Sequence, residues 1–487
     1  MNLLRYMREL VDSVTMYRLT FYGLAGISTI SVLFGAIGRI PYSAGSQLLS
    51  LIAILGAAYI ANRTLSIIKN VPINSESWLI TSLILFLILP PVRSAQDVGL
   101  LMLTAIIAMA SKFILVYRRK NIFNPAAVGA AILVPATWWV GSSVLLPFTA
   151  LFAAMLLLKL RLFRLFFAFA LVALAASGAM AMAENIPINE AILVGIVSGP
   201  LIFLGSVMLT EPSTLPPTHG KRLVYGALVG LLFALHPRLA GITLSPEVAL
   251  LIGNLFAFAA GSRYRLKMKL IDKRQLSPTT YEFVFSPERP FTYKPGQYME
   301  WTLPHRGTDI RGNRRSFSLA SSPTETSVRI GVKIPTPSSS YKQALLQLKP
   351  GQSLYASHVV GDFTLPQNLS VKYVFIAGGI GVTPFRSIIK YLLDSHPEHL
   401  KNIIVVYITH DAEKAAYLDI LREAGQHGLE HIPADSTITA AQFSTLIPDL
   451  TQRTAYISGP STMVEHYKTI MKQAGVGKIQ TDHFSGY

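Results

Sequence analysis

The chain has 487 residues, of which 51% are hydrophobic and only 14% are charged, and its formal net charge is +17. It contains no cysteine, which excludes disulfides, thiolate zinc sites and Cys-ligated iron–sulfur clusters. The excess positive charge lies mostly in short loops between apolar runs, so it indicates a membrane rather than nucleic acid as the partner.

Apolar runs dominate residues 1–262, and at about 20 residues per crossing we expect about ten transmembrane helices there. The predicted spans are 17–37, 47–68, 77–91, 97–117, 124–141, 143–158, 162–183, 190–209, 222–237 and 246–262. Most lysines and arginines fall in the loops on one side, whereas Arg39, Arg93 and Arg238 fall on the other. This positive-inside bias predicts a multi-pass protein of the bacterial cell (plasma) membrane with both termini in the cytoplasm.

Ten spans divide into two groups of five, and an odd number of helices per repeat would invert the second copy. Two features recur at matching places in the halves: a proline break (Pro90-Pro91 and Glu211-Pro212) and an asparagine in the fifth and tenth spans (Asn124 and Asn254). A five-plus-five inverted repeat is one interpretation. The alternative is that proline and asparagine only mark helix ends.

The clearest membrane motif covers residues 208–230, which read M-L-T-E-P-S-T-L-P-P-T-H-G-K-R-L-V-Y-G-A-L-V-G. Residues 121–129 (N-I-F-N-P-A-A-V-G) and 254–258 (N-L-F-A-F) accompany it. Together they resemble, in the same order, the Rnf-D/Nqr-B membrane family, whose members belong to the Rnf complex and to the sodium-pumping NADH:quinone reductase. The resemblance covers most of residues 75–262 and implies a role in membrane electron transport.

A proline-rich break at membrane depth frees backbone polar groups, which either protein or a bound polar ligand must satisfy. A flavin or quinone ring is one such ligand, and a re-entrant turn satisfied internally is the alternative. The candidate residues for a membrane flavin or quinone are Asn124, Thr210, Glu211, Pro212, Thr218 and Asn254. Residues 141–158 lack the G-E-T-S-like threonine motif that carries covalent FMN in this family, which leaves a non-covalent second flavin, FMN or riboflavin.

Residues 263–487 have the charges, turns and alternating apolar strands of a soluble protein. Residues 315–318 (R-S-F-S) resemble the R-x-[YF]-S motif of the ferredoxin–NADP reductase superfamily. The resemblance implies that Arg315 pairs with the FAD pyrophosphate, that Phe317 stacks on the isoalloxazine and that Ser318 lies near flavin N5. It predicts an antiparallel β-barrel FAD domain over residues 263–368 and an α/β NAD(P) domain over residues 369–487.

Further FAD contacts are expected from the neighbouring strands, from a helix start rich in hydroxyls and from a C-terminal aromatic ring that would shield the flavin. These residues are Tyr298, Ser316, Val332, Lys333, Ser339, Ser340, Phe484 and Tyr487. The alternative for the C-terminal aromatic residues is a hydrophobic tail that only packs on the domain.

A buried strand at 373–377 runs into a glycine turn and a helix start, which together form a cradle for a pyrophosphate. The expected NAD(P) contacts are Gly378, Gly379, Gly381, Val382, Thr383, Pro384, Ser458, Gly459, Pro460 and Met463. Ser458 stands where the superfamily usually has the cysteine beside the nicotinamide, so Ser318 and Ser458 are the expected catalytic residues. Thr409-His410-Asp411, at the end of the second strand, favours NADH over NADPH because an acidic side chain repels a 2′-phosphate.

The sequence therefore predicts a membrane flavoenzyme that moves electrons from NAD(P)H through FAD into or across the bilayer, to a quinone or an extracytoplasmic flavoprotein or other acceptor. A redox-driven ion pump or transporter component is the first alternative. A haem-type ferric reductase is the second, but it needs paired histidines in the bundle, where only His219 and His236 occur, both near helix ends. No haem, metal site or nucleic-acid partner is expected, and the oligomeric state is left open.

Overall fold

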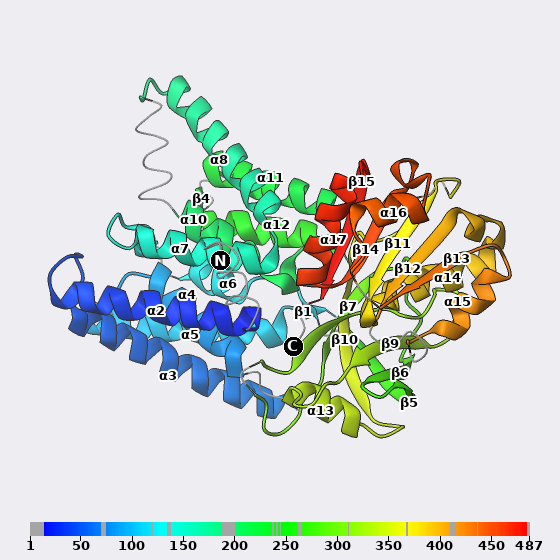
Figure 1. Ribbon diagram of the computed structural model, residues 1–487. Coiled ribbons are helices and arrows are strands. Elements are labelled where there is room, and N and C mark those ends of the chain that lie inside the picture. The colour runs from blue at the N-terminus through cyan, green and yellow to red at the C-terminus, as the bar shows by residue number, and fades with distance from the viewer. Residues whose placement is uncertain are drawn as a thin grey trace. The chain divides into compact units, whose positions relative to one another are not determined.

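The computed structural model describes residues 14–69, 75–117, 120–133, 138–187, 200–235, 238–239, 242–243, 245–261, 265–309, 311–366, 369–409, 415–435 and 437–484. The chain divides into two compact units, Met1–Tyr264 and Arg265–Tyr487. Each unit is described by itself (Figure 1).

The N-terminal unit is a bundle of helices. Its helices are α2 (Met16–Ala36), α3 (Ala44–Ile68), α4 (Ser75–Ile88), α5 (Ala95–Ile114), α6 (Pro125–Ile132), α7 (Leu146–Leu160), α8 (Phe163–Ala183), α10 (Leu201–Phe203), the π-helix η3 (Leu204–Met208), α11 (His219–Leu235) and α12 (Pro246–Ala260). Within the described residues, four helices (α2, α3, α5 and α8) are long and apolar enough to cross a membrane, judged by length and composition. Three shorter apolar helices lie in α4, α7 and α12.

Two predicted spans differ from the observed elements. The span expected at 124–141 is not one helix: α6 ends at Ile132, and a 3₁₀ turn at Trp139–Gly141 follows Trp138, whose φ of 49° is left-handed. A run of apolar residues therefore satisfies the hydropathy criterion without being one continuous helix. The span expected at 190–209 lies partly outside the described residues, and its described part is α10 and η3.

Polar residues at helix starts explain where several helices begin. Ser94 and Asp97 form a reciprocal capping box at the start of α5. Asn124 caps α6 by accepting a hydrogen bond from Ala127 N, and Pro125 follows it at the first helical position.

Backbone groups around the first proline break, Pro90-Pro91, form hydrogen bonds with protein side chains. The indole Nε1 of Trp139 donates to Phe86 O (3.1 Å) and Leu89 O (2.9 Å), which are carbonyls near the end of α4. After the break, Val92 N donates to Ser50 Oγ (2.8 Å) on α3. Side chains of neighbouring segments thus satisfy the backbone around Pro90-Pro91, as apolar surroundings demand.

Glycines bring pairs of helices into backbone contact. A Cβ on Gly226 of α11 would lie 2.9 Å from Leu165 O, and the ideal Cβ of Gly230 would lie 3.2 Å from Ala173 N, both on α8. Helices α8 and α11 lie side by side (Figure 1). Likewise, a Cβ on Gly129 of α6 would lie 2.9 Å from Thr104 O on α5. Small residues at such interfaces are typical of helices packed within membranes.

The C-terminal unit begins with a six-stranded antiparallel sheet in the order β8-β7-β10-β5-β6-β9. Its strands are β5 (Arg265–Ser277), β6 (Thr280–Pro287), β7 (Tyr298–Thr302), β8 (Arg314–Ser318), β9 (Val328–Lys333) and β10 (Ser353–Val360), and helix α13 (Ser340–Gln347) follows β9. A hydrogen bond from Ala320 N to Arg329 O (2.8 Å) joins the ends of the two edge strands, so the sheet closes into a barrel. Phe283, Phe285 and Trp301 fill its interior.

A five-stranded parallel sheet completes this unit, in the order β13-β12-β11-β14-β15. Its strands are β11 (Tyr373–Gly378), β12 (Ile403–Ile408), β13 (Glu430–Ala434), β14 (Thr454–Pro460) and β15 (Lys478–Phe484), with helices α14 (Thr383–Ser395), α15 (Leu418–Gly425), α16 (Ala440–Leu446) and α17 (Ser461–Gln473). Every residue of β11 is buried, which requires cover on both faces of the sheet. The predicted β-barrel and α/β folds are both present.

Candidate functional site

Arg315 lies on β8 with its guanidinium buried against the barrel. Its Nη1 donates to the carbonyl oxygens of Arg311 (2.7 Å), Gly312 (3.2 Å) and Arg314 (2.7 Å). Its Cζ lies 5.0 Å from the ring centroid of Tyr341, in cation–π range. These contacts fix the guanidinium in one position, as a residue that pairs with a pyrophosphate requires.

Tyr341, which is fully buried in α13, joins the β8 motif to the helix start. Phe317 lies with its ring 6.1 Å from that of Tyr341, on the same side of β8 as Arg315. Helix α13 therefore begins close to Arg315. Its N-cap is Ser339, whose Oγ accepts from Lys342 N at 3.4 Å.

The serines at this helix start differ in their surroundings. Ser340 is engaged: its N donates to Asp309 Oδ2, and its Oγ accepts from Asp309 N and contacts His305 Nε2, each at 2.9 Å. Ser338 Oγ is buried and has no hydrogen-bond partner among the described residues. The sequence predicted Ser339 and Ser340 as phosphate contacts, but the orphaned hydroxyl belongs to Ser338, which sequence reasoning missed.

Several positively charged side chains lie near the start of α13. Burial, together with the nearby charges of Arg315, Arg311 and Lys333, lowers the pKa of Lys342 to about 8. Arg315 and Lys342 are both buried, and like charges held together out of water are costly unless an anion joins them. The cluster and the orphaned Ser338 hydroxyl thus fit the diphosphate of a dinucleotide.

We expect the affinity for FAD to fall as the pH rises above about 8. Lys342 loses its proton there in the FAD-free protein, and a bound diphosphate requires the proton back, so each pH unit costs up to about tenfold in the association constant. Below pH 8 Lys342 is already protonated and the slope disappears. FAD titrations at pH 7 to 9.5 measure this, with Lys342→Met expected to remove the slope and the exposed Lys349→Met expected to keep it.

The other predicted FAD contacts lie on three strands. Tyr298 pairs with Ser318 across β7 and β8, and an ideal Cβ on Gly361 (φ 115°) would lie 3.1 Å from its ring. Ser316 is exposed, Val332 is buried and Lys333 is exposed at the end of β9. Phe484 ends β15 but its side chain, like the whole of Tyr487, lies outside the described residues.

The predicted nicotinamide contacts converge at the ends of β11 and β14. These strands are parallel neighbours, with Ala377 opposite Ser458. A Cβ on Gly381 would overlap Ser458 O and lie 2.8 Å from Gly459 Cα, and a Cβ on Gly378 would lie 2.6 Å from Met463 Sδ. Glycine is therefore required at position 381 for the turn to pack on β14, whereas the atoms near Gly378 belong to the flexible side chain of Met463.

The rest of the predicted coenzyme loop follows in order. Gly379 (φ 53°) opens a 3₁₀ turn that includes Val382, and α14 begins at Thr383-Pro384. Strand β14 ends at Pro460, and helix α17 begins at the next residue, Ser461. Thr409 lies at the end of β12, whereas His410 and Asp411 lie outside the described residues, so the preference for NADH stays a prediction.

Ser458 Oγ is fully buried and has no hydrogen-bond partner among the described residues. An unpaired buried hydroxyl costs free energy, and a ligand amide or carbonyl would satisfy it. We therefore expect Ser458→Ala to leave the melting temperature of the coenzyme-free protein unchanged or higher. The same variant should raise the KM for NADH about fivefold, for the loss of a hydrogen bond worth ~1 kcal/mol. The exposed Ser444→Ala is the control, and equal KM values for both variants would contradict the role of Ser458.

Asp482 joins the flavin motif to the nicotinamide motif. It stands opposite Ser458 in the parallel pairing of β14 and β15. Ser318 Oγ donates to its Oδ2 at 3.4 Å. Asp482 thus bonds one expected catalytic serine, Ser318, and neighbours the other, Ser458, in the sheet. Sequence reasoning missed Asp482 because its place depends on the register of β15, which no local pattern specifies.

Three of the six candidates for a membrane flavin or quinone site form a hydrogen-bonded network in the N-terminal unit. Asn124 Nδ2 donates to Glu211 Oε2 (2.8 Å), and Asn124 N donates to Asn254 Oδ1 (2.8 Å). Asn254 Nδ2 in turn donates to the hydroxyl of Tyr225 (3.0 Å). Asn124 and Asn254 are separated by 130 residues of chain, yet they lie side by side where α6 meets α12. Tyr225 was not among the predicted residues.

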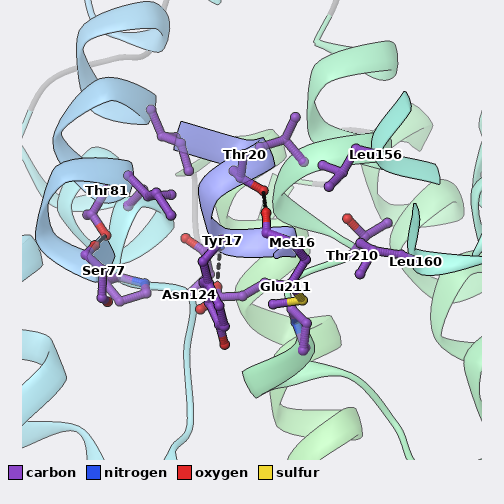
Figure 2. Close-up of a pocket in the computed structure, with 16 residues that line it drawn as sticks. Met16, Tyr17, Thr20, Ser77, Thr81, Asn124, Leu156, Leu160, Thr210 and Glu211 are labelled. Carbon is purple, nitrogen blue, oxygen red and sulfur yellow. Dashed lines mark hydrogen bonds between the residues drawn. The ribbon is translucent and has the colours of Figure 1, made fainter. Parts of the chain in front are cut away.

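A cavity of about 60 Å³ lies beside this network (Figure 2). Four of the predicted residues line it, namely Asn124, Thr210, Glu211 and Pro212, together with side chains from α2, α4 and α7. The cavity has room for several water molecules. Thr218 does not line it; its carbonyl accepts from Arg222 N in the first turn of α11.

Three threonine hydroxyls at the cavity have already donated their protons. Thr20 donates to Met16 O (2.8 Å), Thr81 to Ser77 O (2.9 Å) and Thr210 to Ser206 O (2.5 Å). Their oxygens, and the Glu211 carboxylate, remain as hydrogen-bond acceptors. The wall therefore suits a ligand that offers N–H or O–H donors.

Comparison with known proteins places residues 375–469 in the family described as "Oxidoreductase NAD-binding domain". The ferredoxin reductase component of 3-ketosteroid-9-alpha-monooxygenase from Mycolicibacterium smegmatis is 27% identical over 195 residues, which are 38% of this chain and 52% of that protein. A flavohemoprotein from Bacillus cereus is 25% identical over 42% of this chain and 57% of its own length.

Among solved structures, the flavohem-like FAD/NAD-binding domain of nitric oxide dioxygenase from Vibrio cholerae matches 45% of this chain and 98% of its own, with 20% identity and a TM-score of 0.40. The chain spans about half the length of the curated relatives that it matches. The matches confirm the prediction of a ferredoxin-reductase-like module with an oxidoreductase NAD-binding domain in the C-terminal unit.

Proposed function

We propose that this chain is a membrane flavoenzyme that takes hydride from NADH or NADPH onto FAD and passes the electrons into its membrane-embedded half. The observation that carries the proposal is that Asp482, which accepts a hydrogen bond from Ser318, is the neighbour of Ser458 across β14 and β15. A residue of the flavin motif and a residue of the nicotinamide motif thereby lie close to one another, as direct transfer between two rings requires.

The protein's own groups supply binding and orientation. Arg315, Lys342 and Ser338 would hold the FAD diphosphate, and the glycine turn at Gly378–Gly381 would hold that of the coenzyme. Ser458 Oγ would bond the nicotinamide amide, and Ser318 would lie at the reacting edge of the flavin. Bound FAD supplies the conversion of a two-electron hydride into single electrons.

The membrane half is proposed to cross the bacterial plasma membrane with both termini in the cytoplasm. Support comes from the apolar helices α2, α3, α5 and α8 and from the placement of basic loops. The helix pairs also support two inverted repeats of five, because α3 packs on α5 as α8 packs on α11, and α5 packs on α6 as α11 packs on α12. Helix α2 meets α7, and α6 meets α12, as equivalent elements across a pseudo-twofold axis would.

The second proline break is the proposed membrane redox site. The first break is closed by Trp139 and Ser50, whereas the second has a cavity and a network of polar side chains beside it. The acceptor-rich wall favours a flavin ring, with its N–H donor, or a quinol over an oxidised quinone, which offers only acceptors. A whole ring needs more space than the present cavity of about 60 Å³, so its binding would move side chains apart.

Counting flavins tests the two halves of the proposal separately. We expect denatured, purified protein to release one FAD and one further non-covalent flavin per chain, and NADH to bleach both under anaerobic conditions. A sample that stays colourless after FAD is supplied, or that neither NADH nor NADPH reduces, would refute the reductase assignment. A single FAD per chain would refute the membrane flavin and leave electrons to reach a quinone directly. Reduction of a soluble quinone analogue by NADH then identifies the acceptor class.

A further inference from the structure

The flavin and nicotinamide motifs lie on different subdomains of the C-terminal unit, and one arginine spans them. Arg386 is in the first turn of α14, the helix that begins at the coenzyme turn. Its Nη1 donates to Ala320 O (2.9 Å), two residues after Ser318, and its Nη2 donates to Glu325 Oε1 (3.0 Å). Nη1 also contacts Glu325 Oε2. One guanidinium therefore connects the coenzyme helix to the segment that leaves the flavin strand.

Arg386 is the end of a buried chain of alternating charges. Glu325 also pairs with Arg329 Nε (3.1 Å), and Arg329 Nη1 pairs with Glu282 Oε2 (2.8 Å). The side chains of Arg386 and Glu325 are only 10% and 13% exposed. The four groups sum to zero charge, and buried ion pairs often add little net stability because the loss of hydration offsets their attraction.

Two neutral contacts hold the same segment. Ser387 Oγ, beside Arg386 on α14, donates to Ser321 O (2.6 Å). The hydroxyl of Tyr293 donates to Ser321 O (3.1 Å) and contacts Ser321 Oγ (3.0 Å) from the barrel side. The Arg386 Cζ also lies 5.8 Å from the ring centroid of Tyr417, which precedes α15. The segment 320–325 is thus clamped between the barrel and α14.

We infer that Arg386 is a positioning residue for hydride transfer: it sets the distance between the nicotinamide and flavin rings by holding α14 against segment 320–325. The inference rests on the proposed reductase function and deepens it. In the part of the chain that the structure describes, Arg386 contacts no residue of the flavin motif or of the glycine turn through its guanidinium, so its effect on the rings would pass through Ala320 and Glu325. A transfer between rings in near-attack contact is steeply sensitive to displacement, and about 1 Å can cost about a hundredfold in rate.

The test compares Arg386→Lys with Lys468→Met in the full-length protein. Lysine keeps the charge but cannot form the forked contacts to Ala320 and Glu325. Lys468 lies on α17 and pairs with Glu465 at the surface. For Arg386→Lys we expect full FAD content and an NADH dissociation constant within about threefold of wild type. Flavin reduction at saturating NADH should slow about 10- to 100-fold, with a weaker long-wavelength charge-transfer absorbance, which reports ring overlap.

A purely structural role would give a different pattern. Arg386→Lys would then lower the melting temperature or the FAD content while the protein that retains FAD reduces at the wild-type rate, which would overturn the inference. If Arg386→Lys folds poorly, Glu325→Gln is the second variant, because it keeps the shape of the side chain and removes its charge. It should likewise slow flavin reduction. If wild-type flavin is reduced by neither NADH nor NADPH, the proposed function itself fails, and the two failures are thereby distinguished.

Discussion

Replacing Arg315 with alanine is expected to yield protein that is purified without FAD and that oxidises NADH at less than about 1% of the wild-type rate. Charge-assisted hydrogen bonds to a diphosphate contribute ~1.5–3 kcal/mol each, so losing two of them weakens FAD binding at least a hundredfold. Arg315 Nη1 also bonds two carbonyls of the loop before β8, those of Arg311 and Gly312, and that of Arg314 at the start of the strand. That loop should loosen in the same variant.

The neighbouring Arg314 gives a matched control for this experiment. It lies on the same strand, and its guanidinium pairs with Glu300 of β7 at 3.5 Å. Arg314→Ala removes the same charge one residue away and should retain FAD at wild-type stoichiometry. The FAD content by absorbance and the dissociation constant by titration decide the matter. Equal FAD binding by both alanine variants would mean that Arg315 does not hold the diphosphate.

The second large effect is expected for Gly381→Ala, which should abolish reduction by NADH while FAD stays bound. The new methyl group would overlap Ser458 O and lie 2.6 Å from the Ser458 carbonyl carbon. Both neighbours are backbone atoms and cannot rotate away, so the glycine turn or the end of β14 must move. Overpacking of this kind costs ~1–3 kcal/mol, and it displaces the hydroxyl proposed to bind the nicotinamide.

Gly477→Ala is the control for steric effects in the same subdomain, because a Cβ there would meet nothing within 4 Å. Its KM for NADH should equal that of wild type, whereas the KM of Gly381→Ala should rise more than about tenfold. Stopped-flow reduction measured with equal FAD content separates coenzyme binding from flavin loss. Wild-type kinetics in Gly381→Ala would show that the turn does not approach the coenzyme as proposed.

The motifs of the C-terminal half were predictable because each is a local run with its own backbone demand. The glycine turn follows a fully buried strand, and the hydroxyl-rich segment starts α13, so short-range patterns place both. The partners that complete the sites come from far along the chain. Asp309 reaches Ser340 across 31 residues and Asp482 reaches Ser318 across 164. Strand register and loop closure decide these contacts, and periodicity carries no information about either.

In the N-terminal unit, hydropathy located apolar runs but did not place their breaks. The run at 124–141 is mostly apolar, yet it is not one helix, and Trp139 donates to carbonyls at the end of α4 and just beyond it. The pairing of Asn124 with Asn254 likewise needed the packing of α6 on α12. Residue types at the second break were predictable from their pattern, whereas their common cavity was not.

The glycine contacts between α8 and α11 have a mechanical consequence. Two helices whose main chains touch at Gly226 and Gly230 cannot slide along each other without first lifting apart. The two helices therefore behave as one rigid element beside the second proline break. The rate of electron tunnelling falls steeply with the distance between redox centres. Centres bound to such a rigid pair of helices would keep a constant spacing during turnover. Any movement that accompanies catalysis in this half would then have to occur in other helices.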